Sequence, residues 1–119
     1  MTLGELEAAI RASWGRDTSD DPDEWTPEWT SRGQCAVTAH VIRELLGGEI
    51  LVARVTPSVN EHHCWNRLWS GVEIDLTMEQ FRDGQVLGEP WVGEPTPDTL
   101  PRCELLLARV REKLGLPGA

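Results

Sequence analysis

The chain has few basic residues and no long apolar run. Eleven lysines and arginines stand against 20 aspartates and glutamates, which gives a formal net charge of −9 over 119 residues. Proteins that bind nucleic-acid phosphates or anionic membrane surfaces need clustered Lys and Arg. No stretch approaches the ~20 apolar residues of a membrane span. We therefore expect neither nucleic acid nor a membrane as a partner.

The chain also lacks the marks of secretion and of a structural metal site. The N-terminal "MTLGELEAAI" has no basic segment and no cleavage site, which predicts a cytoplasmic protein. Three cysteines without a CxxC pair, Cys35, Cys64 and Cys103, suit neither a disulfide framework nor a structural zinc site. We expect no metal and no cofactor. A zinc site made of Cys35, Cys64, His62 and His63 is an alternative on ligand type alone.

The apolar pattern predicts a single domain over residues 1–119, in which helices flank a small sheet. Capping residues with helical spacing indicate helices, and β-branched runs bounded by Gly or Pro indicate strands. The expected elements are helix 2–14, a solvated acidic loop at 16–31, helix 34–46, strand 49–57, hairpin strands 62–68 and 72–76, a short helix at 77–81, an irregular arm at 83–98 and helix 99–114. This order predicts an α+β domain with its helices on one face of an antiparallel sheet.

Cys35 opens the second of these helices, in "RGQCAVTAHVIRELLGG" at 32–48. The free amides and the dipole at a helix N-terminus favour a thiolate, and the amides can also bind an oxyanion. A nucleophilic cysteine further needs a base, and the base needs an orienting group. His40 lies five residues along the same helix and faces elsewhere, so the base is expected from the hairpin, where His62 and His63 begin the first strand.

The register of the hairpin selects the base. Adjacent strand residues point to opposite faces, so only one of His62 and His63 is expected to face Cys35. A three-residue turn ending in glycine pairs Leu68 with Val72 and puts His63 on the face of Asp75. A two-residue turn would put His62 there instead. The glycine suits the three-residue turn, which favours His63 as the base and Asp75 as its orienter.

Two resemblances follow from these residues. Gly33-Gln34-Cys35 resembles the nucleophile motif of transglutaminases, and His63-Cys64-Trp65 followed by Asp75 resembles their His-x-Trp and downstream Asp. The longer pattern resembles the YunG-like family of small bacterial proteins, and it consists of Trp25, Trp29, the run 33–39, the run 46–49, His63, the run 65–68, the run 75–77 and Gln80-Phe81. Cys64 stands where that family more often has an aromatic residue.

Both resemblances imply a papain/transglutaminase-like fold, with a Cys-bearing helix packed on a small antiparallel sheet that carries His and Asp. They imply Cys35, His63 and Asp75 as catalytic residues. Because the chain is much shorter than a full transglutaminase, they do not imply protein cross-linking.

Other polar and aromatic residues near these motifs are candidates for a cleft. Gln34 and Asn66 are either structural hydrogen-bonders or part of the site. Trp25, Trp29 and Trp65 are hydrophobic bulk in the first place, and alternatively form the wall of a substrate cleft or aim an indole N–H at an oxyanion.

The sequence thus supports two hypotheses about function. The first is a cysteine-dependent peptidase, amidase, deamidase or transferase, which forms a Cys35 thioester with a peptide or a small amide or thioester substrate. The second is a non-catalytic papain-like binding module. The oligomeric state and the acyl acceptor stay open.

Overall fold

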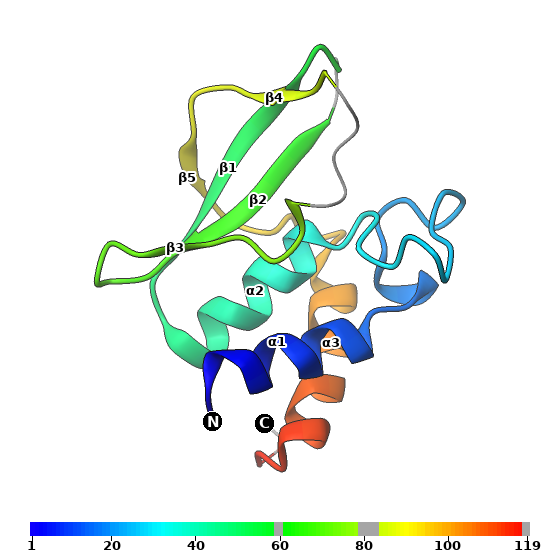
Figure 1. Cartoon of the computed structure of the whole chain (residues 1–119), viewed down its shortest axis with the longest axis vertical. Coiled ribbons are helices and arrows are strands. Elements are labelled where there is room, and N and C mark those ends of the chain that lie inside the picture. The colour runs from blue at the N-terminus through cyan, green and yellow to red at the C-terminus, as the bar shows by residue number, and fades with distance from the viewer. Residues whose placement is uncertain (59–60, 79–83, 118–119) are drawn as a thin grey trace.

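A computed structural model describes residues 1–58, 61–78 and 84–117, and it confirms the α+β class. In this part of the chain a curled antiparallel sheet stands at one end, and three helices lie below it (Figure 1). The helices are α1 (Leu3–Ser13), α2 (Cys35–Leu46) and α3 (Leu100–Leu114), with a 3₁₀ turn η1 (Arg16–Thr18); the strands are β1 (Glu49–Thr56), β2 (His62–Arg67), β3 (Glu73–Ile74), β4 (Val86–Leu87) and β5 (Trp91–Gly93).

The three predicted helices form close to their expected limits. Thr2 caps α1 by accepting a hydrogen bond from the Glu5 N–H, Gly47 ends α2, and Thr99 precedes α3. The short helix expected at 77–81 falls mostly outside the described residues. None of the described helices is long and apolar enough to cross a bilayer.

The hairpin has the predicted three-residue register. Asn66 pairs with Ile74 and Arg67 with Glu73, and the Leu68 N–H donates to the Val72 carbonyl at 2.8 Å. Gly71 closes the turn with φ 92°, a conformation that glycine adopts without strain. The register therefore places His63 and Asp75 on one face of the hairpin.

The arm predicted as irregular at 83–98 contributes two strands, which corrects the expected three-stranded sheet. In the sheet order β3-β2-β1-β4, β5 also pairs with β1, so both short strands follow the same edge of β1. Gly88 and Pro90 lie between the two strands and interrupt the ladder. Pieces of two and three residues are too short to show an alternating pattern in the sequence.

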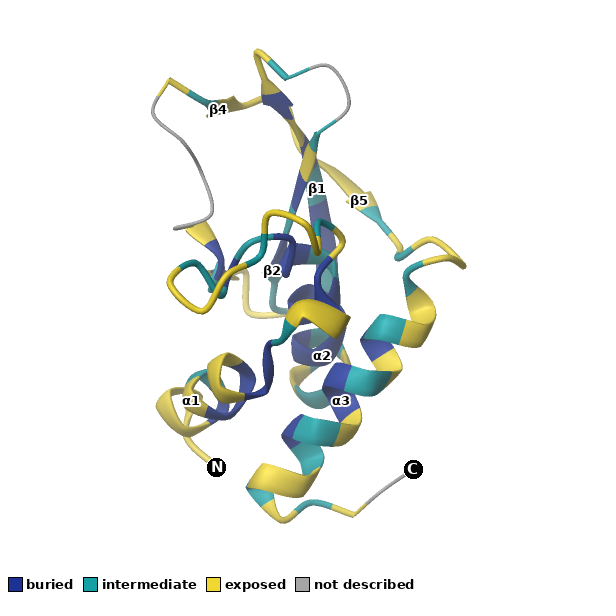
Figure 2. Ribbon diagram, turned by 90° about the vertical axis from the view of Figure 1, so that its right-hand side faces the viewer, coloured by how far each residue is buried: buried dark blue, intermediate teal, exposed yellow. Residues whose placement is uncertain are grey.

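The core lies between the helices, with α2 at its centre (Figure 2). Six consecutive α2 residues, 37–42, are buried, as expected for a helix that is apolar over much of its circumference. Most of the buried cluster comes from the three helices, and Ile74 of β3 joins it. A smaller cluster of Leu51, Ala53 and Trp65 packs on the sheet. Asn66 of β2 donates to the Ala39 carbonyl at 2.9 Å, and this bond joins α2 to β2.

Candidate functional site: the thiol of Cys35 at the edge of β2

Cys35 is the first residue of α2, and no side chain caps this end of the helix. The first intrahelical bond runs from the Thr38 N–H to the Gln34 carbonyl at 3.0 Å. The amides of the first turn, which begins at Cys35, therefore have no partner within the helix itself. The thiol side chain is 5% exposed. It lies where partial positive charge from the helix favours an anion.

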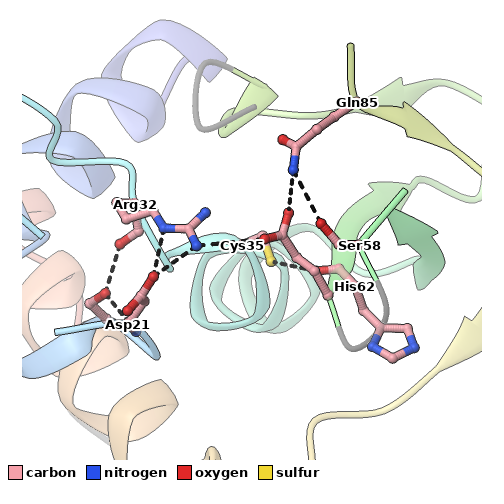
Figure 3. Close-up of polar contacts among 8 residues, drawn as sticks. Asp21, Arg32, Cys35, Ser58, His62 and Gln85 are labelled. Atoms are coloured by element: carbon pink, nitrogen blue, oxygen red, sulfur yellow. Dashed lines mark hydrogen bonds and ion pairs between the residues drawn. The ribbon is translucent and has the colours of Figure 1, made fainter. Parts of the chain in front are cut away.

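The thiol approaches β2 at its outer edge rather than from one face. The Glu61 carbonyl accepts from the Val55 N–H at 2.9 Å, toward β1, and the next carbonyl, of His62, points the other way. The Cys35 sulfur lies 4.0 Å from that His62 oxygen, while the His62 ring points away from it (Figure 3). In the described residues β3 pairs with β2 only at Asn66 and Arg67. The edge of β2 at His62 is therefore not covered by β3, and Cys35 of α2 contacts it there.

An edge position lets side chains from both faces of β2 reach the thiol. Cys35 interacts with the imidazole of His63 and with the thiol of Cys64, its neighbour in the chain. The expectation that only one of two adjacent strand residues faces Cys35 holds for His62 and His63, but it overlooked Cys64. The physical reason is that alternation restricts contacts made from above or below a strand and not those made along its edge.

The imidazole of His63 is fully buried and oriented by a carboxylate. Its Nε2 lies 2.6 Å from Oδ2 of Asp75, which leaves Nδ1 for Cys35. The other carboxylate oxygen of Asp75 accepts from the Thr77 N–H at 3.1 Å. The indole of Trp65 stacks on the imidazole, with ring centres 5.7 Å apart and planes at 19°. The imidazole is thus held in place by the bond to Asp75 and by packing against Trp65.

The electrostatics of the pair favour a thiolate and an imidazolium. A hydrogen bond from Cys64 lowers the pKa of Cys35 well below its ordinary value, with further help from His63 and against the opposing effect of burial. Burial alone would lower the pKa of His63, but the bonds to Asp75 and to the Cys35 thiolate raise it to about 9. A lowered thiol pKa next to a raised imidazole pKa favours a thiolate–imidazolium ion pair.

The pKa values of the other two thiols, Cys64 and Cys103, are raised instead of lowered. The hydrogen bond that Cys64 gives to Cys35, together with burial, raises the pKa of Cys64 far above the ordinary range, so Cys64 stays a neutral donor. Burial raises the pKa of Cys103 to about 11. Of the three thiols, Cys35 is the one favoured as an anion near neutral pH.

Asp20 is a part of the site that sequence reasoning missed. The residue is exposed, yet its carboxyl borders a recess of about 510 Å³ that Arg102 also lines. Desolvation of the carboxyl by the surrounding protein and the charge on Cys35 raise the pKa of Asp20 to about 6, against the effects of Arg102 and Arg32. The acidic segment was expected to be a solvated loop. The segment is exposed over most of its length, as expected, and it also brings a carboxyl with a perturbed pKa close enough to Cys35 to feel its charge.

Gly33 explains how the acidic segment comes so close. Its φ is 74°, and a Cβ there would lie 2.7 Å from Oδ1 of Asp20 and 2.9 Å from the Asp20 nitrogen. The Asp20 N–H donates to the Gly33 carbonyl at 3.0 Å, and the Ser19 hydroxyl donates to the Arg32 carbonyl at 2.7 Å. The glycine before Gln34 and Cys35 therefore serves a close approach of two backbones.

A chain of polar contacts passes beside Cys35, from Asp21 and Arg32 to Gln85 and Ser58 (Figure 3). Arg32 lies 2.7 Å from the carboxylate of Asp21 and 3.6 Å from that of Glu61. Gln85 then donates to Glu61 at 3.3 Å and to Ser58 at 3.4 Å. These contacts tie the segment before α2 to the loop before β2, and so fix how the two halves of the site meet.

Gln34 and Asn66, which the sequence left open between structure and site, both bond to the backbone of the scaffold. The Gln34 amide is fully buried; it donates to the Gly15 carbonyl at 3.0 Å and accepts from the Thr18 hydroxyl at 2.8 Å. The Asn66 amide donates to the Ala39 carbonyl at 2.9 Å, which joins β2 to α2. The described contacts of both amides are thus those of structural hydrogen-bonders.

The three tryptophans proposed for the cleft each make contacts with other parts of the protein. Trp25 donates its indole N–H to the Thr30 carbonyl at 2.9 Å, and Trp65 donates its own to Glu73 at 2.6 Å. Neither N–H is available to an oxyanion in this arrangement. The ring of Trp29 lies under the guanidinium of Arg32, 5.2 Å from the ring centre.

A cavity next to the thiols is lined by a different tryptophan, Trp91. The cavity measures about 320 Å³ and lies between the sheet, the first turn of α2 and the segment leading into α3; its lining includes Ala36, Ile50, Val52, His62, Cys64, Trp91, Gly93, Glu94, Pro95, Thr96 and Thr99. Trp91 lies on the arm whose strands the sequence did not show.

The alternative zinc site finds no geometric support. Among the described residues no group of three or more His, Cys, Asp and Glu side chains is arranged to hold a metal ion. His40, the third histidine, is buried in α2 away from these residues. The described geometry is that of a thiol and an imidazole in contact.

Comparison with known proteins identifies the family of the chain. The family model described as YunG protein matches residues 2–115. The chain belongs to the YunG family. It is 42% identical over 80 residues to "Uncharacterized protein YunG" of Bacillus subtilis (strain 168), a match that covers 67% of this chain and 64% of the relative. The matched part thus spans less than two thirds of the relative's length. No solved structure matches the chain significantly.

Proposed function

We propose that the protein is a cysteine-dependent acyl-transfer enzyme that forms a thioester on Cys35. The observation that carries the proposal is the chain of contacts from Cys35 to His63 to Asp75, with the pKa of the thiol lowered and that of the imidazole raised to about 9. A nucleophile, a base and an orienting group in contact are the parts that covalent acyl transfer needs.

Each residue has a role in the proposed reaction. The Cys35 thiolate attacks the carbonyl carbon of an amide, and the oxyanion that forms accepts from free amides of the first turn of α2. The imidazolium of His63 then gives its proton to the departing amine, which leaves a thioester and a neutral imidazole. His63 next takes a proton from water or from an acceptor amine, which attacks the thioester and releases the product. Asp75 keeps the imidazole in the required tautomer.

The arrangement also supports the papain/transglutaminase-like relationship proposed from the sequence. A helix begins at the nucleophile, the histidine follows on β2, and the aspartate comes directly after β3, the next strand of the antiparallel hairpin. By this proposal the substrate is a peptide or a small amide or thioester.

The first test is the pH dependence of alkylation by iodoacetamide, a reagent small enough for a thiol that is 5% exposed. The three cysteines are read separately by mass spectrometry. We expect Cys35 to react near neutral pH with one thiol labelled per chain, and Cys103 to react only at alkaline pH, since burial raises its pKa to about 11.

The second part of the test uses His63→Ala. The substitution removes the cation beside the thiolate, so the pH at which Cys35 reacts should rise while that of Cys103 stays the same. Acylation is followed in the same proteins with p-nitrophenyl acetate, by the mass of Cys35. If Cys35 titrates like a free thiol in both proteins and takes no acetyl group, the site is not a nucleophile, and the chain acts as a binding module.

A further inference from the structure

The cavity of about 320 Å³ beside the thiols shares its wall with the nucleophilic site. Cys64 lines the cavity and also donates a hydrogen bond to Cys35. His62 lines it too, and its carbonyl lies 4.0 Å from the Cys35 sulfur. Ala36, the residue after Cys35 in the first turn of α2, completes this shared wall. Cys35 itself does not line the cavity, but a group bound there contacts three residues that adjoin the Cys35 thiol.

The rest of the cavity wall is mostly apolar. Ile50 and Val52 contribute from β1, and Trp91 faces them from the paired strand, opposite Val52 in the register. Gly93 packs directly against Val52, because a Cβ there would lie 2.6 Å from Cγ2 of Val52. The indole of Trp91 is held edge-on to the His62 ring, with ring centres 5.8 Å apart. The aromatic wall is thus braced by a residue that adjoins the thiol.

The charges around the cavity argue against a charged occupant. Glu94 is the one acidic side chain among the lining residues, and it is paired with Arg43 at 2.6 Å. No Lys or Arg is among the lining residues, so an anionic group would find no permanently charged partner there. The hydroxyls of Thr96 and Thr99 lie 3.0 Å apart at the start of α3 and supply the polar edge.

We propose that this cavity is the acyl-group pocket of the Cys35 site, and that it takes an uncharged, apolar side chain or acyl chain of the substrate. The inference rests on the proposed function and adds the class of substrate. A chain held between Trp91 and the β1 side chains brings its carbonyl to Cys35, with Cys64 forming the floor between the pocket and the thiolate. Pockets of this size and apolar lining are typical of small-molecule sites.

The test compares three p-nitrophenyl esters that differ in the acyl chain: acetyl, 3-phenylpropionyl and succinyl. The rate of Cys35 acylation is measured for each by mass spectrometry. We expect the 3-phenylpropionyl ester to react at least about tenfold faster than the acetyl ester, since an apolar pocket discriminates by this order. The succinyl ester should show no such gain.

Trp91→Ala should reduce the ratio of the 3-phenylpropionyl to the acetyl rate several-fold. Trp69→Ala is the matched control, because Trp69 is 78% exposed in the hairpin turn and does not line the cavity. It should keep the wild-type ratio. Thr96→Lys places a cation at the polar edge of the pocket and should raise the rate of the succinyl ester relative to the acetyl ester.

The two proposals fail in different ways. Acylation of Cys35 at rates that ignore the chain, or a ratio unchanged by Trp91→Ala and Thr96→Lys, overturns the pocket and leaves the acyl-transfer proposal standing. If no ester acylates Cys35, the proposed function is wrong. The pocket is then judged by binding of 3-phenylpropanamide to the Cys35→Ser protein, followed by NMR at the indole N–H of Trp91. An unmoved Trp91 signal overturns the pocket as well.

Discussion

Replacing Asp75 with Asn tests the centre of the proposed site. The carboxylate lies 2.6 Å from Nε2 of His63, and that ring is fully buried. A hydrogen bond to a charged group contributes about 1.5–3 kcal/mol. At 1.36 kcal/mol per pKa unit, its loss lowers the pKa of His63 by roughly 1–2 units from about 9.

The assay is an NMR titration of the imidazole ring protons. The chain has three histidines, so each signal can be assigned by single substitutions. Glu73→Gln is the matched control, because Glu73 lies two residues earlier on the same hairpin arm and bonds to Trp65 instead of His63. It should leave the pKa of His63 in place. An equal shift in both variants, or none in Asp75→Asn, would refute the assigned role of Asp75.

The same substitution should change how stability depends on pH. The folded-state pKa of His63, about 9, lies above the unfolded value of about 6.5. The stabilisation from its proton is therefore complete below pH ~6.5, and it disappears as the pH rises through about 9. The difference in unfolding free energy between wild type and Asp75→Asn should shrink over this range. Turnover that depends on Cys35 should fall on the order of 10³–10⁴-fold.

Three further predictions concern the surroundings of the thiol. Cys64→Ala removes the donor to the thiolate and should raise the pH at which Cys35 is alkylated, whereas Cys64→Ser keeps a donor and should not; identical titrations of the two variants would contradict this. Gln34→Ala loses two buried hydrogen bonds and should lower the free energy of unfolding, measured in urea, by roughly 3 kcal/mol. A decrease below ~1 kcal/mol would contradict a structural role for Gln34. Asp20→Asn deletes a negative charge near Cys35 and should lower the pH at which Cys35 is alkylated below the wild-type value. A rise in that pH would contradict the prediction.

The hairpin and α2 could be predicted because their determinants are local. Gly71 after two turn residues fixes the register within a few positions, and the register alone decides that His63 shares a face with Asp75. The helix limits follow from its apolar run and from Gly47. These are the parts of the site in which neighbours in the sequence are also neighbours in space.

The edge strands could not be predicted because their partner is distant. Trp91 pairs with Val52, 39 positions earlier, and its strand has only three residues. Nothing in a three-residue segment after Pro90 indicates pairing, since a strand of that length shows no period. The cavity wall formed by Trp91 was missed for the same reason, and the aromatic candidates fell instead on residues close in sequence to Cys35 or to His63.

The acidic segment shows how composition can mislead about a single residue. Five acidic residues between Asp17 and Glu24 are typical of a solvated loop, and Asp17 and Asp21 do lie in surface ion pairs with Arg109 and Arg32. Asp20 differs because the positive φ of Gly33 lets its backbone pack there. The same glycine belongs to the motif that precedes Cys35. Gly33 therefore determines how close the Asp20 carboxylate lies to Cys35. The negative charge of Asp20 disfavours the Cys35 thiolate, whereas Cys64 and His63 favour it. The pKa of Cys35 depends on both effects.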